Sequence, residues 1–124
     1  MRFVILIWHN PGARELWRQL STEEREAGLS AYAALSEDLE ASGEMVMTAA
    51  LADPSLAKRV IVRDGETIAT DGPFAEVKEH LAGFYLIECD TVERAVAYAA
   101  RIPEAAAGMA VEVRPVLERI SVDM

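Results

Sequence analysis

Two stretches of the chain are apolar at nearly every position, a pattern that predicts strands buried on both faces. In residues 3–8, Phe3, Ile5 and Ile7 would face one side of a strand and the intervening apolar residues the other. Residues 83–89 have the same character. We therefore predict two central strands of one sheet.

A long helix is predicted over residues 22–42. Ser21 and Glu24 have the spacing of a capping box at its start, and Gly43 can supply a left-handed cap at its end. A short helical turn packed by Leu16 and Trp17 is predicted before it, within 13–20. The predicted buried stripe of the long helix consists of Leu29, Tyr32, Leu35, Ser36 and Leu39.

A second helix is predicted after residue 90. Asp90 with Glu93, or Thr91 alone, would cap its start, and Pro103 would end it. Its predicted buried stripe consists of Val92, Ala95, Val96, Ala99 and Ile102.

The remaining strands are predicted from alternation and from turn residues. Residues 45–50 form one strand, and 60–63 and 66–69 form a hairpin, because Asp64-Gly65 suits a type I′ turn. In 111–116, Val111 and Val113 alternate with charged residues, as in an edge or half-exposed strand, and Pro115 near the end suits an edge.

The order strand, helix, strand, strand, helix, strand predicts an α+β, ferredoxin-like fold with an inserted β-hairpin, as one domain over residues 1–124. Two helices cover one face of a four-stranded sheet, yet the central strands are apolar on both faces. A second copy of the chain would cover the other face, so we expect a homodimer of the dimeric α+β barrel type.

Composition narrows the partners and the compartment. The 124 residues are 52% hydrophobic and carry a net charge of −9, which disfavours nucleic acid as a partner. The apolar run at 3–8 is too short for a signal peptide or a membrane helix, so no membrane partner is expected. Cys89 is the only cysteine and is expected to be a buried thiol, which fits the cytoplasm.

The segment 63–87, which contains Asp71-Gly72-Pro73-Phe74, resembles the defining segment of the DGPF branch of the YCII-related proteins. Residues 101–103 and 111–116 extend the resemblance over nearly the whole chain. It implies a ferredoxin-like dimer with no settled biochemical activity. The wider group has a proposed catalytic His and Asp, and counting from Gly43 and Pro103 places Tyr32 and Ile102 at those positions.

The loop Asp71, Gly72, Pro73 and Phe74 is a candidate ligand site, with an acceptor carboxylate, a close backbone approach and an apolar wall. The same residues also suit a rigid turn for purely conformational reasons. Both interpretations, a ligand-binding loop and a structural turn, stay open, and we favour the structural turn.

Charged residues beside this loop are further candidates. Lys78 and Glu79 match the family segment, and His80 could exchange protons at neutral pH. The alternative is a solvated, charged segment without a binding role.

Two candidates lie elsewhere in the sequence. Tyr32 would supply either a pocket hydroxyl or a core ring with a satisfied hydroxyl. Arg114, on the same face of its strand as Glu112, would form an ion pair with it across the dimer or line a cleft with Asp71, and structural pairing is favoured.

No paired spacing of His9, His80 and Cys89 indicates a zinc site, and no phosphate-binding or dinucleotide fingerprint is present, so no metal or cofactor is expected. Three functions remain. The chain could be a homodimer that binds a small molecule beside the DGPF loop, with a regulatory role. It could be an acid/base or cofactor-independent oxygenase-type enzyme, or a non-catalytic protein-partner module.

Overall fold

The structure is a computed structural model that describes residues 1–73 and 78–122. Its elements, in chain order, are β1 (Arg2–His9), α1 (Pro11–Gln19), α2 (Thr22–Ala41), β2 (Met45–Ala50), the 3₁₀ helix η1 (Pro54–Leu56), β3 (Lys58–Arg63), β4 (Glu66–Asp71), β5 (His80–Glu88), α3 (Val92–Ala99), α4 (Pro103–Ala106) and β6 (Val111–Pro115). Within the described residues, no helix is long and apolar enough to cross a membrane.

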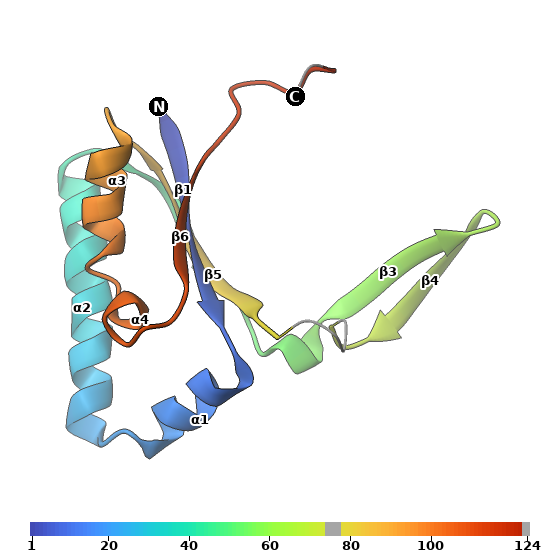
Figure 1. The fold of residues 1–124 in the computed structure, drawn as a ribbon, viewed down its shortest axis with the longest axis horizontal. Helices are drawn as coiled ribbons and strands as arrows, with labels where there is room; N and C mark the ends of the chain where they lie inside the picture. Colours follow the sequence, from blue (N-terminus) through green and yellow to red (C-terminus); the bar gives the residue numbers. More distant parts are fainter. Residues whose placement is uncertain (74–77, 123–124) are drawn as a thin grey trace.

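The main sheet has four antiparallel strands in the order β2-β5-β1-β6. The two strands predicted as central, β1 and β5, are the central ones, and β6 is an edge strand as expected. Helices α2, α3 and α4 lie on one face of this sheet (Figure 1). This arrangement confirms the predicted α+β, ferredoxin-like class.

Helix starts follow their capping residues, but one predicted helix end is wrong. The Ser21 hydroxyl accepts a hydrogen bond from the Glu24 amide at 3.1 Å, and the Glu24 carboxylate accepts one from the Ser21 amide at 3.0 Å. Thr91 alone caps α3. Pro103 does not end α3, which stops at Ala99; it begins α4, because proline suits the first turn of a helix.

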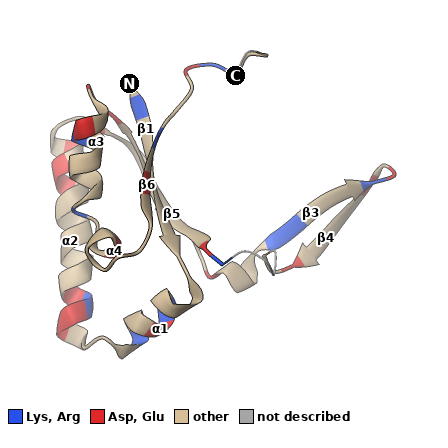
Figure 2. Cartoon of the chain, viewed as in Figure 1, with Lys and Arg blue, Asp and Glu red and all other residues tan. Residues whose placement is uncertain are grey.

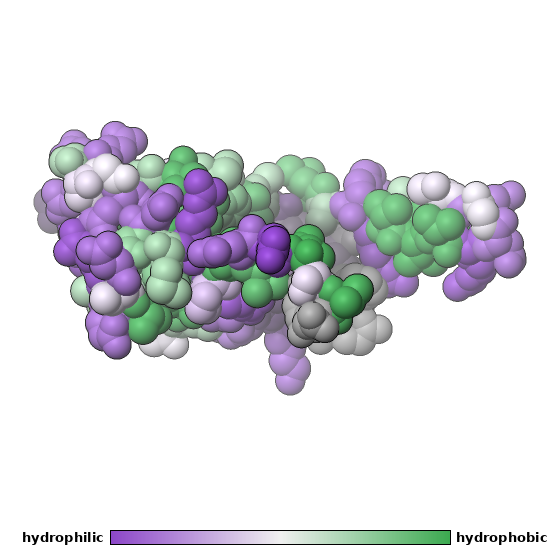
Figure 3. All heavy atoms as spheres, turned by 90° about the horizontal axis from the view of Figure 1, so that it is seen from above, coloured by the Kyte–Doolittle hydropathy of each residue, from purple (hydrophilic) through white to green (hydrophobic). Residues whose placement is uncertain are grey.

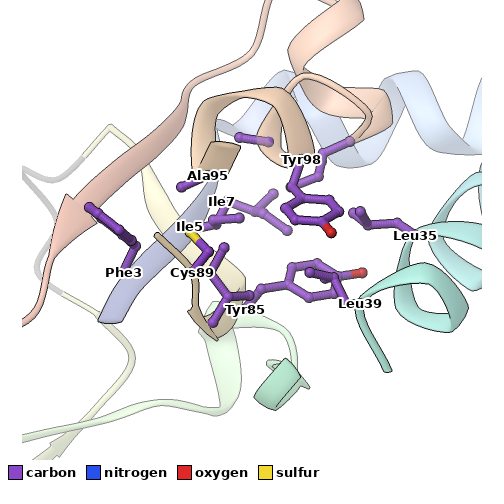
Figure 4. Close-up of a cluster of buried hydrophobic side chains, with 12 residues drawn as sticks. Phe3, Ile5, Ile7, Leu35, Leu39, Tyr85, Cys89, Ala95 and Tyr98 are labelled. Carbon is purple, nitrogen blue, oxygen red and sulfur yellow. The ribbon is translucent and has the colours of Figure 1, made fainter. Parts of the chain in front are cut away.

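The core lies between the sheet and the helices (Figure 4). Ile5, Ile87, Leu35 and Leu39 are fully buried in it. Several predicted stripe residues are exposed instead, because α2 and α3 contact the sheet over a narrower face than periodicity suggested. The exposed members are Leu29, Val92 and Val96, together with Leu16 and Trp17 of α1, in which Ala13 is the buried residue.

Strands β3 and β4 form a separate two-stranded sheet that projects away from the main body (Figure 1). Asp64 and Gly65 join them with φ values of 51° and 78°, the left-handed region that a type I′ turn requires. At the base, the Gly72 amide donates to the Ala57 carbonyl at 2.8 Å. In the described part of the chain, the hairpin thus joins the main body at its base.

The second face of the main sheet carries no helix (Figure 1). On β1, Phe3, Ile5 and Ile7 face the helices and are buried, whereas the alternating positions Val4 and Leu6 are only half-buried. Strand β5 shows the same alternation. We call this side, with Val4, Leu6, Met47, Phe84 and Leu86, the open face.

An ion pair ties the start of β2 to α3. The Glu44 carboxylate accepts hydrogen bonds from Arg94 Nε at 2.5 Å and Nη2 at 2.6 Å, and one from the Tyr98 hydroxyl at 2.6 Å. The Arg94 guanidinium is the main cause that lowers the pKa of Glu44 to about 2. All of these groups bond one another, so the cluster is structural.

This cluster makes stability depend on pH. Because the pKa of Glu44 is lower in the folded chain, its contribution is complete above about pH 4.5 and is lost as pH falls toward about 2. Glu44→Gln should remove about 1–2 kcal/mol of unfolding free energy at pH 7 and much less at pH 3. Urea unfolding at both pH values tests this, with the exposed Glu40→Gln as control. Equal losses at the two pH values would contradict it.

Candidate functional site

Three polar side chains from distant parts of the chain meet beside the carboxyl end of β1. His9 ends β1, Tyr32 lies on α2 and Glu104 lies on α4. His9 Nε2 lies 2.8 Å from Glu104 Oε2, and the Tyr32 hydroxyl donates a hydrogen bond to Glu104 Oε1. The two oxygens of one carboxylate are thus shared between an imidazole and a phenol.

Burial and hydrogen bonding fix the charge of this cluster. Burial would raise the pKa of Glu104, but the hydrogen bonds from His9 and Tyr32 outweigh it and hold that pKa below its ordinary value. Burial, followed by the bond to Glu104, raises the pKa of Tyr32 well above its ordinary value. At neutral pH the cluster therefore contains a carboxylate and a protonated phenol.

This charge state determines what His9 can do. An ionised carboxylate only accepts hydrogen bonds, so Nε2 of His9 must carry the proton that it donates. In the neutral imidazole this leaves the lone pair on Nδ1. The Glu104 side chain is 14% exposed and the His9 side chain 40%, so His9 is the accessible member of the cluster.

Two adjoining clefts lie at the junction of the main sheet and the hairpin base, and His9 is not among the residues that line them. Their volumes are about 260 and 320 Å³, near the lower end of small-molecule sites. The residues common to both are Ala57, Pro73, His80 and Leu81. Trp8 precedes His9 in β1 and lines the first cleft, and His80 is the cross-strand partner of His9.

Some of the predicted loop residues line the first cleft and others do not. Gly72, Pro73, Glu79 and His80 line the first cleft. Asp71 ends β4, and its side chain is 85% exposed and paired with Lys58 across the hairpin. Gly72 has a φ of 80°, as a tight turn requires. Lys78 is exposed, and Phe74 lies outside the described residues.

Neither Tyr32 nor Arg114 is among the residues that line these clefts. Arg114 donates to Glu112 from Nε at 2.9 Å, and Glu112 also accepts the Trp8 indole N–H at 3.2 Å. This pair within one strand lowers the pKa of Glu112. Tyr32 belongs to the His9–Glu104 cluster, and Ile102 is fully buried in the core.

Sequence reasoning missed His9 and Glu104 as members of a site. The available signal was weak: Glu104 lies two residues after the position counted for the family's Asp, and His9 is the first polar residue after an apolar run. Their 95-residue separation follows no local spacing rule. In residues 1–73 and 78–122, no three His, Cys, Asp or Glu side chains are gathered as metal ligands.

Residues 1–119 match the YCII-related domain. The chain belongs to the YCII-related family. It is 33% identical over 99 residues to the uncharacterized protein R00369 of Rhizobium meliloti (strain 1021), a match that covers 80% of this chain and 77% of that protein.

One similar solved structure is that of 5-chloro-2-hydroxyhydroquinone dehydrochlorinase (TftG) from Burkholderia phenoliruptrix AC1100, in complex with 2,5-dihydroxybenzoquinone. The match covers 94% of both chains with a TM-score of 0.53 and 18% identity. At that identity the likeness concerns the fold alone, and it agrees with the ferredoxin-like arrangement described above.

Proposed function

We propose that this YCII-related protein is an enzyme that moves protons on a small molecule, with His9 as the general base. The observation that carries the proposal is the Glu104 carboxylate, which bonds His9 Nε2 and the Tyr32 hydroxyl at once. A carboxylate that fixes one imidazole nitrogen leaves the other free to take a proton, the arrangement used by many acid/base sites. Glu104 and Tyr32 are then positioning residues.

The accessibility of His9 permits a catalytic role. Its side chain is 40% exposed, whereas that of Glu104 is 14% exposed. His9 lines neither cleft, but Trp8, which precedes it in β1, and His80, its cross-strand partner, line the first one. We propose that a molecule bound at this end of the first cleft extends to His9.

For the substrate we propose a small hydroxylated aromatic compound. The first cleft is lined by Trp8 and the apolar Leu81 and Pro73, which suit a planar ring. The basic Lys58 and Arg59 and the acidic Glu79 also line it, and Lys58 pairs with Asp71, so polar groups of both signs are present for the hydroxyl groups of a bound molecule. A protein of the same fold is named for its action on a chlorinated hydroxyhydroquinone. Loss of HCl from such a compound removes one proton and one chloride ion, and the proton requires a base.

The experiment is a chloride-release assay with 5-chloro-2-hydroxyhydroquinone as the first substrate, followed by a panel of halogenated and hydroxylated aromatics. We expect turnover by the wild type and a loss of about 100-fold or more in His9→Gln. Tyr98→Phe, which removes a hydroxyl outside the site, should leave the rate unchanged. Full activity in His9→Gln, or no turnover of any compound, would contradict the proposal that the protein is an enzyme with His9 as its general base.

The two clefts support a second candidate, a binding protein without catalysis, since they include Gly72 and Pro73 of the DGPF segment. A ligand at a hundred times its dissociation constant should stabilise the fold by roughly 2.7 kcal/mol. A thermal-shift response to the aromatic panel that is lost in His80→Ala, without turnover, would favour this candidate.

Membership of the DGPF branch, suggested by residues 71–74, is part of the proposal.

We also propose that the protein is a homodimer whose open faces meet. The open face carries four half-buried apolar side chains, Val4, Leu6, Phe84 and Leu86. Burying them further against a second copy would stabilise the dimer by about 25 cal/mol for each Å² of apolar surface removed from water. The ion pairs Arg2–Glu88 and Arg114–Glu112 leave the same face without net charge.

A further inference from the structure

The β3–β4 hairpin exposes an apolar surface that its own chain does not cover. Val60 is 59% and Val62 69% exposed, and they face the same side of the hairpin as their cross-strand partners Ala69 and Thr67. Seen from above, the hairpin carries a patch of apolar residues well away from the body (Figure 3). A lone two-stranded hairpin is at best marginally stable in water, so this surface needs a partner.

We propose that the hairpin is a dimerisation arm: its Val60 and Val62 side packs against a second copy of the chain that sits on the open face. The inference rests on the homodimer proposed above and adds a second contact to it, which the hairpin makes with the other copy of the chain. It does not depend on the acid/base activity.

Interface size indicates that the open face alone is too small. The strands β1, β2, β5 and β6 have 8, 6, 9 and 5 residues, and at about 3.3 Å per residue and about 4.8 Å between strands they outline roughly 440 Å². A stable interface takes about 800 Å² of surface from each partner. The two six-residue strands of the hairpin add roughly 200 Å². The arm therefore moves the contact toward the size that a stable dimer requires.

Charge distribution selects the side on which a second copy can approach. Helix α2 carries six acidic residues and one basic residue, a charge of −5 out of the −9 of the whole chain. Figure 2 shows acidic residues at both ends of this helix, on the side away from the open face. Residues 58–71 of the hairpin carry three basic and three acidic residues, which cancel. Two copies therefore repel at their helices and meet without repulsion at the sheet and hairpin.

The first experiment compares two double variants by light scattering coupled to gel filtration at several concentrations. Val60→Lys/Val62→Lys should raise the dissociation constant of the dimer about 100-fold or more. Val92→Lys/Val96→Lys makes the same chemical change on exposed valines of α3 and should leave the dimer intact. Val60→Thr/Val62→Thr keeps the β-branched shape and should weaken the dimer less, which separates lost contact from a misfolded hairpin.

The second experiment measures coverage of the arm directly. Cys89 is 5% exposed, so a thiol introduced by Val62→Cys is the one that maleimide can reach. Labelling should be slow in the dimer and at least tenfold faster when Met47→Lys on the open face separates the copies.

Three results would contradict the proposal that the hairpin is a dimerisation arm. A dimer that survives Val60→Lys/Val62→Lys, or fast labelling of the introduced thiol within an intact dimer, would leave the homodimer standing without it. A wild-type protein that is monomeric at tens of micromolar would contradict both the arm and the homodimer.

Discussion

Glu104→Gln should lower kcat on the aromatic substrate about 10²–10⁴-fold while changing KM less than about threefold. The amide cannot hold the proton on His9 Nε2 as a carboxylate does, because it can present either its oxygen or its NH₂ group to the ring. The cleft, which Glu104 does not line, remains as it was. Steady-state kinetics separates the two constants.

The matched control for this change is Glu37→Gln, an exposed position on α2. It should leave both kinetic constants at the wild-type values. If Glu104→Gln raised KM and left kcat unchanged, Glu104 would act in binding or folding and not in positioning a base.

Leu39→Ala should cost about 3 kcal/mol of unfolding free energy. Leu39 is fully buried between α2 and the sheet, so truncation removes apolar contacts and leaves a cavity. Leu29→Ala, on the same helix but 59% exposed, should cost less than about 0.5 kcal/mol. Urea unfolding of both variants checks the contrast. Similar losses at the two positions would mean that α2 packs through a wider face than the structure shows.

The order of the six strands and of α2 and α3 was predictable because each of them has a local signal, whereas η1 and α4 were not predicted. Ser21 with Glu24 and Thr91 mark helix starts through side-chain bonds within one turn. The apolar runs of β1 and β5 identify central strands because a strand with neighbours on both sides is the kind that keeps such a pattern.

Helix faces and helix ends were predicted less well, because tertiary contacts decide them. Val92 and Val96 have the spacing of a buried stripe, but Ala95, Tyr98 and Ala99 occupy the contact with the sheet. Pro103 fits the end of one helix and the beginning of another equally well by local rules, and here it begins α4.

The candidate site was only partly visible in the sequence. Tyr32 was singled out, and His80, Gly72 and Pro73 do lie at a cleft. The carboxylate that organises Tyr32 and His9 comes from Glu104, 72 residues after Tyr32. A contact of that kind depends on how α4 folds back over the end of β1, and no periodicity encodes it.

The most direct test of the proposed acid/base site is the ¹⁵N spectrum of the His9 ring at alkaline pH, with His80→Gln to simplify assignment. The account predicts a single neutral tautomer with the proton on Nε2 and the lone pair on Nδ1, and loss of that preference in Glu104→Gln. A proton on Nδ1, or a tautomer mixture that Glu104→Gln leaves unchanged, would contradict it.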